Sequence, residues 1–335
     1  MEDYYKVIDM GDRIYHIWEP AGVASSLIIG KKKALLIDTG YGYGDLKAVV
    51  ESLTDLPVQV VNTHCHLDHA GGNYQFQNHE ERLCELEYDS RKNIRGSVES
   101  DTILQKINTK ISEQEKRNKT EKQPQLDYAI GIHPYEKAVY RLYQMEQKPL
   151  VIQKILQGKS PEEYPWPADF DIEKYLNYKG CEFRTLQDGE IIDLGERQIR
   201  VIYLPGHTKG SVVLFDEESG TLFSGDNISN SLWIQFEQSE NVYRFAKHLQ
   251  EVQKLPIQKI ISSHKQTPWP PELIQLELDA IAHIKREDSS TFVHPRTGAR
   301  ALRYKYPIPE MNGAKSIYIV YRNTSLQLFS QKNIV

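Results

Sequence analysis

The stretch from His64 to His69 reads HCHLDH and places four side chains of the kinds that bind metal ions within six positions. His64 and His66 are separated by one residue, so on an extended or tightly turning backbone both imidazoles can face one ion. Asp68 and His69 follow closely enough to serve a second ion. Imidazole and carboxylate ligands suit zinc and its neighbours, and the chain has no thiolate cluster of the kind that iron–sulfur sites need. The stretch therefore predicts a metal site.

The segments before these histidines predict strands and a helix in alternation. Apolar stretches from Ser26 to Ile29 and from Ala34 to Ile37 flank a Gly-Lys-Lys-Lys turn, which is typical of a hairpin. The apolar spacing from Asp45 to Leu53 predicts a helix with Asp45 as its N-cap. Val58 to Val61 then reads as a buried strand that runs into the histidines. This order indicates an α/β arrangement with its chemistry at the C-terminal end of a strand.

Three further residues of ligand type lie downstream. His207 in LPGHTKGS, Asp226 in LFSGD and His264 in IISSH each stand just beyond a predicted strand. With the four residues of the first stretch they make seven possible ligands, which suits a site for two ions with a bridging carboxylate. A second interpretation stays open for Asp68, in which it orients the ligands of a single ion.

The middle and the end of the chain differ in character from the rest. Isoleucines at every fourth position (Ile103, Ile107, Ile111) and a second periodic stretch from Pro134 to Gln157 predict a polar helical insertion. This insertion is either a solvated helical surface or a lid that shapes a substrate pocket. The expected units are residues 1–84 as the first half of a core, 85–180 as the insertion, 181–285 as the second half, and 286–335 as a short C-terminal β extension.

Composition narrows the classes of function. The net charge of −5 gives no overall basic field, which disfavours nucleic acid as a partner. Mean hydropathy is −0.55, and no apolar run approaches the ~18 residues of a membrane span. Three cysteines at irregular spacing and an N-terminus without signal-peptide features favour a cytoplasmic protein. We expect a small-molecule substrate as the partner, and a homo-oligomer is an open alternative to a monomer.

The motifs THCHLDHAGG, LPGHTKGS and LFSGD, together with ALLIDTG and the final strand-histidine, resemble the metallo-β-lactamase-fold hydrolases in identity and order. The resemblance covers roughly residues 13–85 and 185–270. It implies an α+β fold, a four-layer αββα sandwich with two metal ions in a cleft along one edge. Its implied ligand sets are His64, His66 and His207 for the first ion, Asp68, His69 and His264 for the second, and Asp226 as the bridge.

The resemblance also suggests a reaction. Two divalent ions, zinc first with iron or manganese as alternatives, would supply a bridging hydroxide as nucleophile, and Asp68 would act as a catalytic proton carrier. Class B β-lactamases with two zincs commonly have cysteine at the position of Asp226, so the ligand set resembles thioesterases of the glyoxalase II type, lactonases and phosphodiesterases. We therefore predict hydrolysis of an ester, lactone or thioester of a small organic substrate. The alternatives are a phosphodiesterase acting on a small organic phosphate and a non-catalytic metal-binding protein.

Two aromatic residues are candidates for the substrate site. Trp18 begins the stretch WEPAGVA, read here as a loop at the position of a flap in the family, and Tyr41 follows the DTG turn. We expect Trp18 and Tyr41 to line the substrate pocket. The competing interpretation is that both are ordinary loop aromatics.

Overall fold

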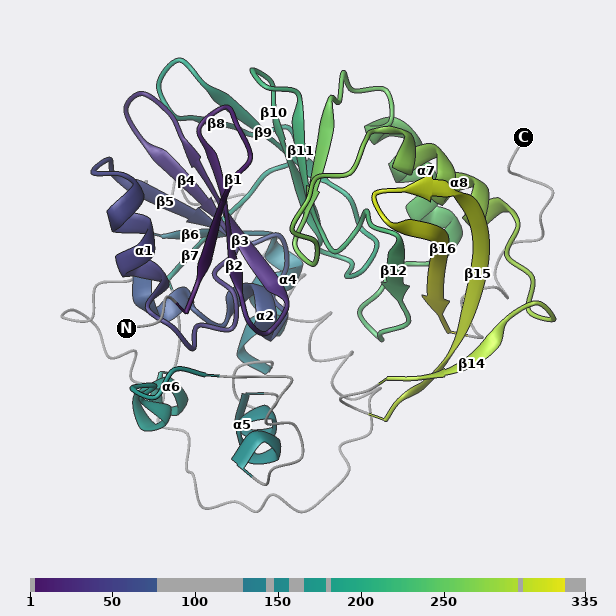
Figure 1. Cartoon of the computed structure of the whole chain (residues 1–335), viewed down its shortest axis with the longest axis horizontal. Helices are drawn as coiled ribbons and strands as arrows, with labels where there is room; N and C mark the ends of the chain where they lie inside the picture. The colour runs from purple at the N-terminus through teal and green to yellow at the C-terminus, as the bar shows by residue number, and fades with distance from the viewer. Residues whose placement is uncertain are drawn as a thin grey trace, which may run out of the picture.

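The structure is a computed structural model that describes residues 4–76, 129–142, 148–156, 166–178, 182–294 and 298–322. Within these ranges the strands form three sheets, with strand orders β1-β2-β3-β4-β5-β6-β7, β13-β11-β10-β9-β8 and β12-β16-β15-β14. In Figure 1 the first sheet lies at the left, the second at the upper centre and the third at the right.

The first sheet contains the predicted hairpin and the strand that leads to the histidines. Its bounds are β1 (Lys6–Asp9), β2 (Ile14–Glu19), β3 (Val23–Ile29), β4 (Ala34–Ile37), β5 (Val58–Val61), β6 (Ile130–Ile132) and β7 (Phe183–Thr185). Strands β1 to β4 are antiparallel, and β4 to β7 are parallel. Helix α1 (Leu46–Leu53) begins as predicted, because the Asp45 side chain accepts a 2.9 Å hydrogen bond from the backbone N–H of Ala48.

The second sheet packs face to face against the first. It consists of β8 (Ile191–Asp193), β9 (Gln198–Tyr203), β10 (Val212–Asp216), β11 (Thr221–Gly225) and β13 (Lys259–Ser262). Ile28, Leu35 and Val61 of the first sheet are buried in one cluster with Val201 and Leu214 of the second. Helix α1 covers the outer face of the first sheet, and helices α7 (Val242–Val252) and α8 (Glu272–Ala282) cover that of the second. The expected αββα sandwich is therefore confirmed.

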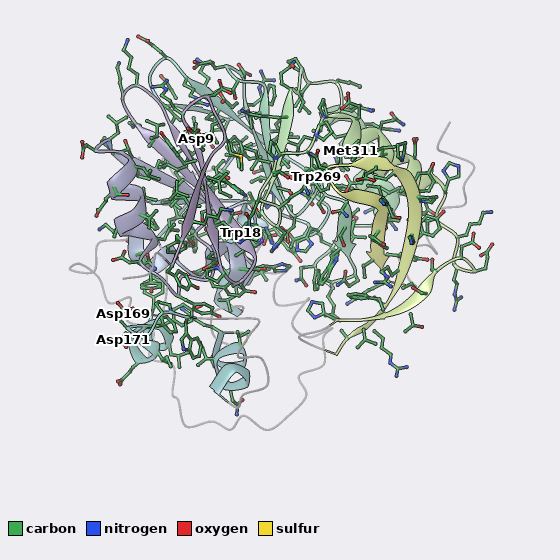
Figure 2. All side chains as sticks on the ribbon, in the orientation of Figure 1. Asp9, Trp18, Asp169, Asp171, Trp269 and Met311 are labelled. Atoms are coloured by element: carbon green, nitrogen blue, oxygen red, sulfur yellow. The ribbon has the colours of Figure 1, made fainter. Side chains whose placement is uncertain are left out.

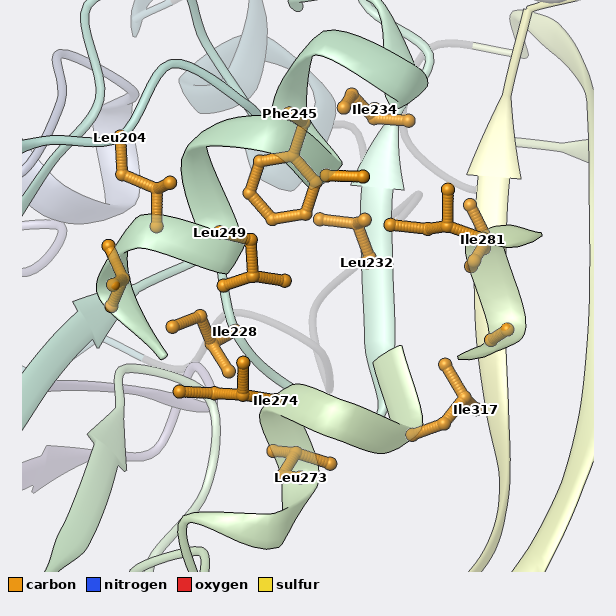
Figure 3. Packing of buried hydrophobic residues seen from close by; sticks show 14 of the residues in the cluster. Leu204, Ile228, Leu232, Ile234, Phe245, Leu249, Leu273, Ile274, Ile281 and Ile317 are labelled. Carbon is orange, nitrogen blue, oxygen red and sulfur yellow. The ribbon is translucent and has the colours of Figure 1, made fainter. Parts of the chain in front are cut away.

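The third sheet encloses α7 and α8 from the other side. It is formed by β12 (Ser231–Ile234), β14 (Ser290–Val293), β15 (Arg300–Met311) and β16 (Ala314–Tyr321). Figure 3 shows Phe245 and Leu249 of α7 meeting Leu232 of β12, with Ile274 of α8 and Ile317 of β16 in the same cluster. Strand β16 pairs in parallel with β12 and antiparallel with β15, so the strands expected as a short C-terminal β extension continue a sheet that begins at β12.

The middle segment is only in part helical where it is described. Helices α4 (Pro134–Leu142), α5 (Lys148–Leu156) and α6 (Ile172–Asn177) agree with the expected helical character, but Ile130–Ile132 is β6 of the first sheet. The single helix expected from Pro134 to Gln157 is two helices, and the isoleucines at 103, 107 and 111 lie outside the described residues. In the part of the chain that is described, no helix combines the length and apolar character of a membrane span.

Candidate metal centre

The first three residues of the HCHLDH stretch lie between β5 and the short helix α2 (Leu67–Ala70), and the last three lie in α2, which is followed by the 3-10 helix η1 (Asn73–Phe76). Its polar members are buried, with Asp68 and His69 on the single turn of α2. The two glycines that follow allow this placement. A Cβ on Gly71 would lie 2.4 Å from the backbone oxygen of Tyr41, and one on Gly72 would lie 2.3 Å from that of Thr39. Only glycine lets these backbones approach so closely.

The three downstream residues reach the same place from the second sheet. His207 lies in the loop after β9, Asp226 directly follows β11, and His264 lies two residues beyond β13. Because β11 and β13 are parallel neighbours, their C-terminal ends deliver Asp226 and His264 to one edge. Gly225 has a φ of +54°, and a Cβ there would lie 2.8 Å from the Thr63 hydroxyl, which explains the glycine before Asp226.

All seven predicted ligands come together in three overlapping groups. Within each group the possible ligand atoms lie within 4.8 Å of one another: His64, His66 and His207; His64, His69 and Asp226; Asp68, His69 and His264. The first and third groups are the two ligand sets implied by the resemblance, and the second joins them through Asp226.

Asp226 stands between the two sets. Its Oδ2 lies 3.5 Å from Nε2 of His207, while its Oδ1 lies 3.3 Å from Nε2 of His69 and 3.3 Å from Nε2 of His264. Each carboxylate oxygen therefore faces a different set. This arrangement is suited to a bridging carboxylate.

Hydrogen bonds fix the orientation of the imidazole rings of His64 and His69. Asp38 accepts hydrogen bonds from the Thr63 hydroxyl at 2.8 Å and from Nδ1 of His69 at 2.8 Å. Because the Thr63 proton is used in this way, its oxygen accepts from Nδ1 of His64, 3.1 Å away. His64 and His69 thus both turn Nε2 toward the centre, and the buried carboxylate of Asp38 orients His69 directly and His64 through the Thr63 hydroxyl. Asp38 belongs to the ALLIDTG motif, but its role was not foreseen from the sequence.

Backbone carbonyls orient two more rings. Nδ1 of His207 donates to the carbonyl of Trp233 at 2.6 Å, and Nδ1 of His264 donates to that of Gly22 at 2.8 Å. Their Nε2 atoms therefore face the centre as well. His66 presents the other nitrogen, since its Nδ1 lies 2.9 Å from Nε2 of His207.

The electrostatics suit a cation. Burial and the neighbouring rings hold the pKa of His64 well below its usual value, and burial lowers the pKa of His66 and His207, so these three are neutral. Burial also lowers the pKa of His69, but the carboxylates of Asp226 and Asp38 outweigh it and raise that pKa well above the usual value. The carboxylates of Asp226 and Asp38 thus favour a positive charge at this place.

A buried ligand nitrogen without a hydrogen-bond partner indicates whether a metal ion fits the site. Nε2 of His64 is buried and finds no hydrogen-bond partner in the described ranges, which is costly for a polar atom unless a ligand occupies the site. With imidazole nitrogens and carboxylate oxygens as the donors, the residues fit divalent cations of the zinc, iron or manganese kind.

Glu136 of α4 connects the loop that carries His64 and His66 to the loop that carries His207. Its buried carboxylate accepts hydrogen bonds from the backbone N–H of Cys65 at 3.0 Å and of Gly210 at 3.1 Å. The side chains of Cys65 and Thr208 add hydrogen bonds to the same carboxylate. A Cβ on Gly210 would lie 2.6 Å from Oε1 of Glu136, so the carboxylate also explains the glycine of HTKGS. No sequence signal identified Glu136, because it lies in the segment expected to be an insertion.

The two candidate substrate residues lie differently from the expectation. Trp18, labelled in Figure 2, is in strand β2 and not in a loop, and its side chain is half-buried. The Tyr41 ring is fully buried, 5.2 Å from that of Tyr43, in a cluster with Tyr175 of α6. A fully buried ring offers no surface to a substrate, so the assignment of Tyr41 to the pocket is corrected. Tyr41 instead helps to attach the α5–α6 segment to the core.

The sequence pattern of the metallo-beta-lactamase superfamily matches residues 18–81 and 151–264, and the chain belongs to this superfamily of metal-dependent hydrolases. Among individual proteins, the acyl-coenzyme A thioesterases MBLAC2 of Bos taurus and Homo sapiens are each 22% identical over 311 residues, covering 84% of this chain and 88% of theirs. A hydroxyacylglutathione hydrolase of Synechococcus sp. (strain JA-3-3Ab) is 46% identical over 43 residues, which are 13% of this chain and 17% of that one. A solved metallo-beta-lactamase from Pontibacter korlensis aligns with a TM-score of 0.48 at 15% identity, over 84% of this chain and 100% of that one.

Proposed function

We propose that this protein hydrolyses thioesters of small organic acids at a dinuclear metal centre. The observation that carries the proposal is Asp226, whose two carboxylate oxygens face two separate sets of ligand nitrogens 3.3–3.5 Å away. The relatives point to the bond that is cleaved, because one is named an acyl-coenzyme A thioesterase and another a hydroxyacylglutathione hydrolase.

The ligand residues divide into two sets with one shared member. His64, His66 and His207 would hold one ion, and Asp68, His69 and His264 the other, with Asp226 between them. When bound, a pair of divalent cations supplies a water that is nucleophilic at neutral pH and a Lewis acid for the acyl oxygen. The residues around the sets maintain this geometry: Asp38 orients His64 and His69, and Glu136 joins the two loops.

The reaction needs a proton at the leaving group. Water adds to the acyl carbon, the carbon–sulfur bond breaks, and the products are a carboxylate, a thiol and one proton that is released to solvent. We assign Asp68 to transfer the proton from the attacking water to the departing sulfur. Its Oδ2 lies 3.7 Å from Nε2 of His264, whose side chain is partly exposed.

A panel of substrates tests the proposal. Protein loaded with Zn²⁺ would be assayed on acetyl-coenzyme A, S-lactoylglutathione, a lactone, an aryl ester, bis(p-nitrophenyl) phosphate and a penicillin. We expect the thioesters to be the best substrates and Asp226→Asn to lower kcat/KM by 100-fold or more, by analogy with ligand losses in metal sites (~2.7 kcal/mol). Asp55→Asn, an exposed loop variant, is the control that retains activity. Turnover of the phosphodiester alone, or turnover that does not depend on metal, would overturn the proposal.

A further inference from the structure

The third sheet has one face that α7 and α8 do not cover. In the strand pairing of this sheet, Arg303 of β15 lies opposite Val320 of β16, and Val320 lies opposite Trp233 of β12. Lys305 of β15 lies opposite Tyr318 of β16. Residues that lie opposite one another point to the same side, so these side chains share one face. Phe292 joins them opposite Ala301. The alternate residues, among them Leu302 and Ile319, pack against α7 and α8. We call the set Trp233, Phe292, Arg303, Lys305 and Tyr318 the aromatic–basic face.

Aromatic contacts run from this face to the metal centre. The Phe236 ring lies 5.2 Å from the rings of both His66 and His207. His294, just after β14, lies 5.9 Å from Phe236 and 5.2 Å from Trp233. The ligands and the third sheet are therefore connected by packed rings.

The far part of the face carries positive charge. The Arg303 guanidinium lies 6.0 Å from the ring of Phe292 and 5.6 Å from that of Tyr318. Arg303 and Lys305 are exposed, and neither forms an ion pair with a carboxylate of the described residues. The strand residues on this face include no carboxylate, although the whole chain carries a net charge of −5. By contrast, Lys315 lies on the opposite face and pairs with Glu310 at 3.5 Å.

We propose that the aromatic–basic face binds the phosphate-bearing carrier of a thioester substrate, with the acyl group at the metal centre. This inference rests on the proposed function. A guanidinium held against aromatic rings is suited to bind phosphate oxygens in pairs. The partly exposed rings of Trp233 and Phe292 can stack on a nucleobase. A nucleotide-bearing thioester of the coenzyme A class provides an acyl thioester at one end and phosphates with a base at the other.

Binding of free coenzyme A tests this directly, because it requires no turnover. The zinc-loaded wild type, Arg303→Gln and Lys305→Gln would be compared by isothermal titration calorimetry, with Lys315→Gln as the matched control. We expect each face variant to weaken binding about tenfold or more, as the loss of a charged hydrogen bond implies. The control should bind like wild type, and added salt should reduce the difference. No measurable binding of coenzyme A by wild type, or equal binding by all four proteins, would overturn the inference.

Kinetics separate this inference from the proposed function. Acetyl-coenzyme A and S-acetyl-N-acetylcysteamine present the same thioester, but only the first has phosphates. Arg303→Gln should raise KM about tenfold for the first, leave kcat within about twofold, and leave both constants unchanged for the second. Equal effects on the two substrates would show a structural role for Arg303 and refute carrier binding. If wild type binds coenzyme A but hydrolyses neither thioester, the proposed function fails and carrier binding stands.

Discussion

The most informative substitution is at Glu136, which is not a ligand but joins the two ligand loops. In Glu136→Ala the backbone N–H groups of Cys65 and Gly210 both lose their acceptor in a fully buried place. Each hydrogen bond to a charged group contributes roughly 1.5–3 kcal/mol, so the loss is about 3–6 kcal/mol. Because total stabilities are typically ~5–15 kcal/mol, the alanine variant can unfold. Glu136→Gln retains one acceptor oxygen and should cost about half as much.

The consequence extends to metal binding, because Cys65 lies between His64 and His66, and Gly210 follows His207. Loosening these loops should weaken the first metal set more than the second. We expect Glu136→Gln to lower the affinity for one of two Zn²⁺ ions by about 10–100-fold, as changes next to ligands commonly do. Competition with a chromophoric chelator measures both affinities, and urea unfolding of the metal-free protein measures stability. Exposed Glu51→Gln is the control. Zinc affinities and a free energy of unfolding within about 0.5 kcal/mol of wild type would refute the positioning role.

Three other predictions concern the surroundings of the centre. Asp38→Asn should weaken Zn²⁺ binding by roughly 10–100-fold in the chelator assay, because His69 and the Thr63 hydroxyl that orients His64 both lose their charged acceptor; equal affinity would contradict this. Glu277 of α8 is fully buried, and burial raises its pKa well above the usual 4.5. The folded state then holds a proton that the unfolded chain releases, so wild-type stability should fall as pH rises above that value, by at most ~1.4 kcal/mol per pH unit. Glu277→Gln should reduce this slope in urea unfolding between pH 5 and 8 and leave the part that comes from buried Glu19 and Glu136, and an unchanged slope would exclude Glu277 as a contributor. Removal of metal with EDTA should lower Tm, and Tm should recover with rising Zn²⁺ because cations bind the folded state; a Tm independent of Zn²⁺ would contradict the fit of the site.

The parts of the site that the sequence predicted are those encoded locally. The HCHLDH stretch carries its ligands within one turn and a short loop, and strands such as Val58–Val61 have an apolar pattern that ends where the ligands begin. His207, Asp226 and His264 were predictable because each follows a strand. Turn and cap signals, such as Asp45, identified the elements between them.

The parts that the sequence did not predict depend on contacts between distant segments. Glu136 is 71 residues from Cys65 along the chain, and β6 has only three residues, too few for a periodic pattern. Tyr41 was expected to line the substrate pocket, and no sequence signal indicated that Tyr175 of α6 lies beside it, with its hydroxyl donating to the Tyr41 carbonyl at 2.8 Å. The extent of the third sheet was not predicted, because β12, the edge strand that pairs with β16, lies far upstream of β14–β16 in the chain.

The central claim is that two cations, joined by Asp226, perform thioester hydrolysis. Its most direct test is a titration of the metal-free protein with Zn²⁺, in which bound metal per chain and the initial rate on acetyl-coenzyme A are measured in the same samples. We predict that the rate rises until two ions are bound and then levels off, and that Asp226→Asn binds fewer ions and stays nearly inactive. Full activity with no bound metal, or in Asp226→Asn, would contradict the claim.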